Sequence, residues 1–99
     1  MTITADVAII GGGLHGCSAA LQLARRAIRV LVIEKDHVGR HASSVNAGGV
    51  RRLGRHRAEI PLSVAAHAMW CDIEGLVDDD CGFHATGQIK VAETPDELA

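Results

Sequence analysis

The sequence predicts an α/β fold that begins with a strand–helix–strand unit, on the basis of three observations. Residues 6–10 and 30–33 are short apolar runs rich in β-branched side chains, typical of strands covered on both faces. A run of three glycines follows the first of these strands. The segment 14–26 lacks proline and places apolar side chains at helical spacing, namely Leu14, Cys17, Leu21 and Ala24. These features predict two parallel strands joined by a right-handed helical crossover.

The composition limits the class of protein. The chain has 99 residues, a net charge of -2 and 47% hydrophobic residues, which suffices for one modest core and excludes a disordered chain. Trp70 and Phe83 are its only large aromatic residues, and no nucleic-acid motif is present. No apolar run approaches the ~20 residues that span a bilayer. We therefore expect neither a nucleic-acid partner nor a transmembrane segment.

The cysteines and the amino terminus indicate the compartment. Cys17, Cys71 and Cys81 are an odd number without CxxC spacing, which favours reduced thiols over a disulfide framework. The first ten residues contain neither a basic region nor a small-residue cleavage site, so we expect no signal peptide and a cytoplasmic location. The histidines show no HxH or HExxH spacing, and we expect no metal site.

The charge is unevenly distributed along the chain. Residues 1–57 contain nine Lys/Arg and three Asp/Glu, whereas residues 58–99 contain one Lys and nine Asp/Glu. The segment from Arg40 to Arg57 has five arginines and no acid, which favours an anionic ligand. We expect residues 1–57 to form a dinucleotide-binding unit with its loop, and residues 58–99 to begin a second domain.

This second part predicts the beginning of an α+β domain. Residues 59–77 read as one helix, in which Ala65, Met69, Ile73 and Leu76 form an apolar stripe. Residues 88–92 alternate polar and apolar side chains, as a half-buried strand does. Residues 94–99 have the capping residue, proline and acids of a helix start.

The segment from Gly11 to Gly16 fits the pattern G-x-G-x-x-G between the first strand and the helix. In that context Gly11 permits a tight turn, Gly13 lets the backbone approach a pyrophosphate, and Gly16 lets the helix pack closely on the sheet. The free N–H groups at the helix start would bind the phosphates. The pattern predicts a Rossmann-like βαβ unit that binds a dinucleotide containing ADP.

Glu34 supports the same interpretation. It follows the second strand, 18 residues after Gly16, where a carboxylate accepts both ribose hydroxyls of an adenosine. A 2′-phosphate would meet this charge unfavourably, which disfavours NADP. The two motifs do not distinguish NAD from FAD.

Later segments distinguish the two. The sequence resembles the flavin-dependent amine and amino-acid oxidoreductases related to D-amino-acid oxidase, glycine oxidase and sarcosine oxidase. The resemblance rests on IIGGGLHGCSAA, VLVIEKD, SSVNAGGVRR, EIPLS and CGFHATGQIKVA, which span nearly the whole chain. It implies FAD as the cofactor. It also implies hydride transfer from the carbon next to nitrogen of an amine or amino acid to flavin N5, with oxygen or a carrier as the final electron acceptor.

The resemblance also implies roles for individual residues. Asn46 stands where some relatives attach flavin through a histidine, which implies non-covalent FAD at this position. Arg51 and Arg52 follow the flavin-facing glycines and are candidates for binding a substrate carboxylate. No residue is an evident acid–base catalyst. The remaining implied cofactor contacts are Leu14 and His15 at the pyrophosphate, Glu34 and Lys35 around the adenosine, Ala42, Ser43 and Ser44 along the phosphate and ribityl chain, and Ala47, Gly48 and Gly49 beside the isoalloxazine.

The chain departs from the family in two ways. Ala27 stands where the family usually has a glycine after the first helix, which costs about 1 kcal/mol if the residue is left-handed. The family's chains are also several times longer, so we expect a fragment that is inactive on its own. An NAD-binding dehydrogenase and a non-catalytic nucleotide-binding fragment are the alternative functions.

Overall fold

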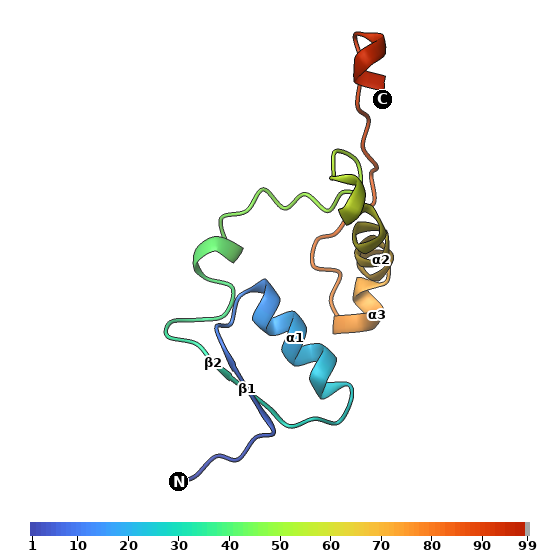
Figure 1. Ribbon diagram of the computed structural model, residues 1–99. Helices are drawn as coiled ribbons and strands as arrows, with labels where there is room; N and C mark the ends of the chain where they lie inside the picture. The colour runs from blue at the N-terminus through green and yellow to red at the C-terminus, as the bar shows by residue number, and fades with distance from the viewer. Residues whose placement is uncertain (99) are drawn as a thin grey trace. The chain divides into compact units, whose positions relative to one another are not determined.

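A computed structural model describes residues 1–98 of the chain (Figure 1). The chain divides into two compact units, residues 1–48 and 49–99, which we describe separately. The functional division expected at residues 57 and 58 stays a prediction. No helix among the described residues has the length and apolar character needed to cross a membrane.

The first unit contains the predicted strand–helix–strand arrangement. Strand β1 (Val7–Ile10) pairs in parallel with β2 (Val30–Ile33), with Val7 opposite Val30 and Ile10 opposite Ile33. Helix α1 (Leu14–Ala24) connects the two strands and packs against both of them. This small parallel sheet with its crossover helix confirms the α/β class.

An ion pair fixes the start of both strands. Asp6 accepts two hydrogen bonds from the Arg29 guanidinium, at 3.0 Å from Nε and 2.7 Å from Nη2, and a third from the Arg29 backbone N–H. In return, the backbone N–H groups of Asp6 and Val7 donate to the Arg29 carbonyl. The guanidinium lowers the pKa of Asp6 through these hydrogen bonds. These bonds between Asp6 and Arg29 therefore set the register of the two strands where they begin.

The face of α1 that packs on the sheet differs in part from the predicted one. Gly16 and Ala20 are partly buried, as is Leu21 of the expected stripe, whereas Leu14, Cys17 and Ala24 of that stripe are exposed. The prediction was wrong for these three because it counted apolar side chains, while close contact between helix and sheet requires small residues on the facing side.

Helix α1 ends in a Schellman motif. Ala27 has a φ of 58°, in the left-handed region. Its N–H donates to the Ala24 carbonyl at 2.9 Å, and the Ile28 N–H donates to the Leu23 carbonyl at 3.2 Å. The sequence-based prediction of a left-handed turn at Ala27 is confirmed.

The second unit is mainly helical. A 3₁₀ turn (Arg57–Glu59) leads into α2 (Ile60–Cys71), which is followed by α3 (Ile73–Val77) and, near the end of the chain, by a second 3₁₀ turn (Pro95–Leu98). The single helix expected over residues 59–77 is wrong. Asp72, with φ -113° and ψ 27°, lies outside the helical region and separates α2 from α3. Asp78, with φ 61°, ends α3.

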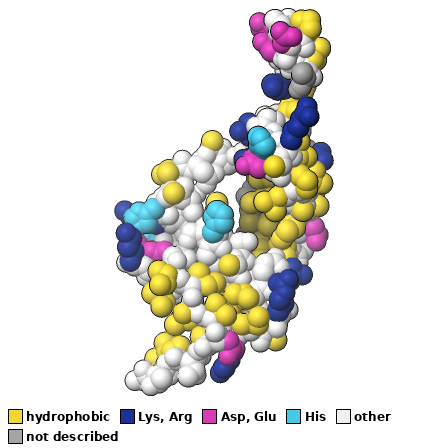
Figure 2. All heavy atoms as spheres, in the orientation of Figure 1, with side chains coloured by type: hydrophobic (Ala, Val, Ile, Leu, Met, Phe, Trp, Pro, Cys, Tyr) yellow, Lys and Arg dark blue, Asp and Glu magenta, His cyan; other side chains and the backbone are white. Residues whose placement is uncertain are grey.

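Two further predictions for this unit are wrong. Residues 88–92 form no strand, and Ile89 and Val91 are 90% and 76% exposed, because a strand requires a neighbour to accept its hydrogen bonds and the described residues supply none there. Of the expected apolar stripe, Ala65 and Met69 in α2 are exposed, whereas Ile73 and Leu76 in α3 are partly buried. The partly buried side chains of α2 are Ser63, His67 and Trp70. Figure 2 shows hydrophobic side chains at the surface.

We predict that Ala27→Gly stabilises the chain by about 1 kcal/mol, because glycine adopts the left-handed conformation without the Cβ clash. Urea denaturation followed by circular dichroism measures the change. Ala24→Gly is the matched control inside α1 and should destabilise by about 1 kcal/mol. An unchanged or lower midpoint for Ala27→Gly would contradict the prediction.

Candidate functional site

The glycine-rich loop of the first unit lies at the carboxyl end of β1. Gly11 has a φ of 105°, which only glycine adopts readily, and its N–H donates to the Ile33 carbonyl at 2.8 Å. The turn therefore begins directly after Ile10 and Ile33, the last paired residues of β1 and β2. It leads directly into α1, whose first N–H groups have no acceptor within the helix.

Gly16 brings α1 against this turn. A Cβ at Gly16 would lie 1.9 Å from the Gly11 carbonyl oxygen and 3.4 Å from a methyl group of Ile9. No side chain fits there. The structure thus gives Gly16 the close-packing role expected of the third glycine of the motif.

Glu34 holds the loop from the second strand. One carboxylate oxygen accepts the Gly12 N–H at 2.7 Å, and the other accepts the Asp36 N–H at 3.0 Å. These two hydrogen bonds lower the pKa of Glu34, and the one from Gly12 has the larger effect. The charge of His41 lowers the pKa by a smaller amount. Sequence reasoning placed Glu34 at the ribose and missed its bond to the glycine loop. Each oxygen retains a second lone pair that can accept a ribose hydroxyl. The ribose contact itself stays a prediction.

Ser43 reaches the same loop from residues 34–48. Its hydroxyl accepts the Leu14 N–H at 3.0 Å, at the start of α1. A Cβ at Gly13 would lie 2.9 Å from this oxygen, so the second glycine of the motif also admits a close contact. The Gly39 N–H donates to the Gly12 carbonyl at 2.8 Å, which ties the loop down a second time. The Ser43 hydroxyl proton remains free to donate to a ligand.

The side chains of Ser44 and Asn46 form hydrogen bonds within their own loop. The Ser44 hydroxyl donates to the Gly39 carbonyl, and the Asn46 side-chain N–H donates to the Ser43 carbonyl. The Asn46 carbonyl oxygen accepts the Gly48 N–H at 2.7 Å, which holds Gly48 at a φ of 67°. Other predicted cofactor contacts of this unit are exposed, namely His15, Lys35, Ala42 and Ala47.

A charged cluster next to Glu34 was missed by sequence reasoning. Asp36 forms an ion pair with Arg40, whose Nε lies 2.8 Å from the carboxylate, while His37 Nδ1 and His41 Nε2 lie 3.1 and 3.9 Å from it. The spacing of Asp36 and Arg40, four residues apart, was the available signal. The cluster surrounds Asp36 with basic side chains.

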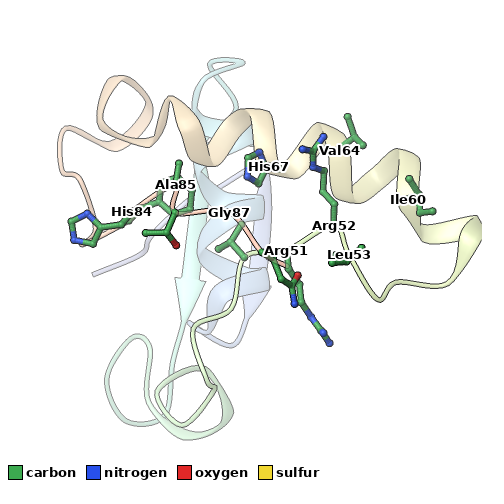
Figure 3. Close-up of a pocket in the computed structure, with 13 residues that line it drawn as sticks. Arg51, Arg52, Leu53, Ile60, Val64, His67, His84, Ala85 and Gly87 are labelled. Carbon is green, nitrogen blue, oxygen red and sulfur yellow. The ribbon is translucent and has the colours of Figure 1, made fainter. Parts of the chain in front are cut away.

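Arg51 and Arg52 belong to the second unit. Both line a cavity of about 430 Å³ together with residues from α2 and from the segment 83–88 (Figure 3). Gly49, the last of the expected flavin-facing residues, also belongs to this unit and has open space around its Cα. No group of three or more potential metal ligands occurs within residues 1–98.

The glycine loop and its carboxylate match the pattern expected of a dinucleotide-binding βαβ unit, and comparison with known proteins identifies the family. The profile of the FAD dependent oxidoreductase family DAO matches residues 6–99. The chain belongs to this family, whose cofactor is FAD. The predicted family resemblance is confirmed.

Individual relatives agree with this assignment. The chain is 34% identical to glycine oxidase of Geobacillus kaustophilus, over 98% of this chain and 28% of that protein. It is 36% identical to FAD-dependent oxidoreductase domain-containing protein 1 of Bos taurus, over 88% and 20%. It is 38% identical to an opine oxidase subunit of Rhizobium meliloti, over 79% and 22%. The chain thus spans about a quarter of the length of these relatives. No solved structure matches it.

We predict that Gly16→Ala destabilises the first unit by about 1–3 kcal/mol, because the new methyl group would force α1 away from the Gly11 carbonyl. Gly49→Ala is the matched control, since a Cβ there meets nothing within 4 Å. Thermal or urea unfolding by circular dichroism measures both. Equal stability of the two variants would contradict the close packing.

We predict that the bond between Gly12 and Glu34 is lost in acid. Because the pKa of Glu34 is lowered on folding from 4.5, its stabilisation is complete above that value and disappears as the pH falls through the lower, folded pKa. The Gly12 and Asp36 amide proton shifts, followed by NMR, should report this transition. Glu34→Gln should abolish it, and the control Glu59→Gln should leave it unchanged. A transition that survives Glu34→Gln would contradict the assignment.

Proposed function

We propose that the whole protein oxidises an amine or amino acid with bound FAD. The observation that carries the proposal is the Glu34 carboxylate bonded to Gly12 within a G-x-G-x-x-G loop, in a chain of the FAD-dependent family. Relatives named as a glycine oxidase and as a subunit of an opine oxidase support oxidation of a nitrogen-bearing carbon. The family match favours FAD over the alternative of an NAD-binding dehydrogenase.

The chain's residues fit the ADP half of the cofactor. The Leu14 N–H already donates to Ser43, whereas the N–H groups of His15 and Gly16, which have no acceptor within the helix, would donate to a pyrophosphate. The Ser43 hydroxyl, which already accepts the Leu14 N–H, would donate its proton to a phosphate oxygen. Glu34 would accept the ribose hydroxyls through its remaining lone pairs, and its negative charge would disfavour a 2′-phosphate.

The other expected contacts remain part of the proposal. Lys35 would lie at the adenosine, Ala42 and Ser44 along the phosphate and ribityl chain, and Ala47, Gly48 and Gly49 at the isoalloxazine. Asn46 is engaged in two hydrogen bonds within its own loop, which supports non-covalent binding at this position. Arg51 and Arg52 would bind a substrate carboxylate. We assign no acid–base catalyst to these residues.

When bound, FAD supplies the acceptor for the hydride that leaves the carbon next to nitrogen, and water then hydrolyses the imine. This chain's contribution is to bind and orient the cofactor. The electrons would pass on to oxygen or to a carrier.

Three free cysteines support the proposed cytoplasmic location, since oxidising compartments favour disulfides.

We predict that the isolated chain, with FAD added, oxidises amines no faster than free FAD does. Residues 1–98 include only the loop expected on one side of the flavin, and a ring open to water lacks the orientation that speeds hydride transfer. A panel of amino acids and sarcosine with an artificial electron acceptor measures this.

A chimera then tests the proposal itself. The aligned segment of the G. kaustophilus glycine oxidase is replaced by this chain, and the unmodified oxidase serves as control. The chimera should retain FAD, seen by its visible absorption, and should oxidise at least one member of the panel. A chimera that binds FAD and oxidises none of them would contradict the proposal, whereas turnover by the isolated chain would contradict only the prediction that the chain is inactive on its own.

A further inference from the structure

The loop that follows β2 is held by polar contacts and not by apolar packing. Among residues 35–48 only Gly39 and Ser43 are partly buried, and every other residue is exposed. Val38, a large apolar residue of this loop, is 64% exposed. Apolar burial therefore contributes little to the position of the loop. Charged and polar groups must fix the position of Ser43, whose hydroxyl meets the start of α1.

Asp36 lies at the centre of these groups. Its N–H donates to Glu34 at 3.0 Å, and its carboxylate lies 2.8 Å from Arg40 Nε. The imidazoles of His37 and His41 lie 3.1 and 3.9 Å from the same carboxylate. Asp36 is also the only acid of residues 36–48. It therefore connects the end of β2 to the basic side chains of the loop.

The backbone between Asp36 and Ser43 enters the left-handed region twice. Gly39 has a φ of 77° and His41 has a φ of 63°. Glycine adopts this conformation freely, whereas a residue with a Cβ adopts it at a cost in free energy. The turn at His41 therefore requires contacts that hold it. Its imidazole lies near Asp36, and its carbonyl accepts the Ser44 N–H at 3.1 Å.

We propose that Asp36 is a positioning residue for FAD. Through Arg40 and His41 it fixes the loop so that the Ser43 hydroxyl lies at the start of α1, where the pyrophosphate is expected. In this position Ser43 accepts the Leu14 N–H, and its own proton stays free for a phosphate oxygen. Without the carboxylate, Ser43 leaves this position more often and FAD binds less tightly. The inference concerns the cofactor alone and does not depend on the substrate of the proposed function.

The first test measures the Ser43 contact in the full 99-residue chain without cofactor. Hydrogen exchange of the Leu14 amide, followed by NMR, should be about fivefold faster in Asp36→Asn, because the bond to Ser43 opens more often. The effect is modest because an exposed ion pair stabilises weakly. Asp6→Asn is the matched control, which breaks the ion pair with Arg29 and should leave this exchange unchanged. Unchanged exchange in Asp36→Asn, or an equal increase in Asp6→Asn, would overturn the proposal.

The second test is a titration of the same chain with FAD, followed by quenching of the flavin fluorescence. Asp36→Asn and Arg40→Gln should each weaken binding about fivefold, whereas Arg40→Lys, which keeps a cation beside Asp36, should retain most of the affinity. Asp6→Asn should leave the affinity unchanged, and circular dichroism checks that each variant folds. Equal losses for Asp6→Asn and Asp36→Asn, equal losses for the two Arg40 variants, or an unaltered chain that binds no FAD would contradict the proposal.

Ser43→Ala separates a positioning role from a direct contact between Asp36 and the cofactor. This variant should weaken FAD binding by itself, because it removes the hydroxyl. In the Ser43→Ala background, Asp36→Asn should cause no further loss, since the carboxylate acts through Ser43. Losses that add in the double variant would refute the positioning role. Failure of the amine-oxidation assay with these binding results intact would count against the proposed function alone.

Discussion

The first unit depends on the peptide groups of Gly12. Its N–H donates to the Glu34 carboxylate, and its carbonyl accepts both the Gly39 N–H and the Cys17 thiol. Gly12 is also the one buried residue among residues 1–98. One residue of the turn is thus bonded to α1, to the end of β2 and to the loop that follows.

This constraint explains why the glycines and the carboxylate form one site. A Cβ at Gly12 would lie 3.0 Å from Val38 and 3.3 Å from Glu34, so a side chain would push the loop away from the turn. With the turn fixed, the Ser43 hydroxyl reaches the start of α1. The same contacts that fold the unit therefore bring Gly12, Glu34 and Ser43 together at the start of α1, where the cofactor is expected to bind.

The second unit is organised by an aromatic contact instead. Phe83 packs against Trp70 and His67 on one face of α2, and this sets the wall of the cavity. Most other residues of α2 are apolar and exposed, with Leu62 75% and Met69 44% accessible. Such a largely apolar helix is suited to burial.

The sequence by itself determined the local elements and the motif. The β-branched runs, the glycine spacing and Glu34 follow from properties of neighbouring residues, so each could be predicted, and the family's usual glycine at this position implied the left-handed turn at Ala27. The tertiary structure alone decided which faces are covered. It left Leu14, Cys17 and Ala24 of the expected stripe exposed, bonded Glu34 to Gly12, directed Arg52 toward α2 (Figure 3) and left residues 88–92 without a strand partner. These depend on contacts between residues distant in the chain, and such contacts leave no periodic pattern in the sequence.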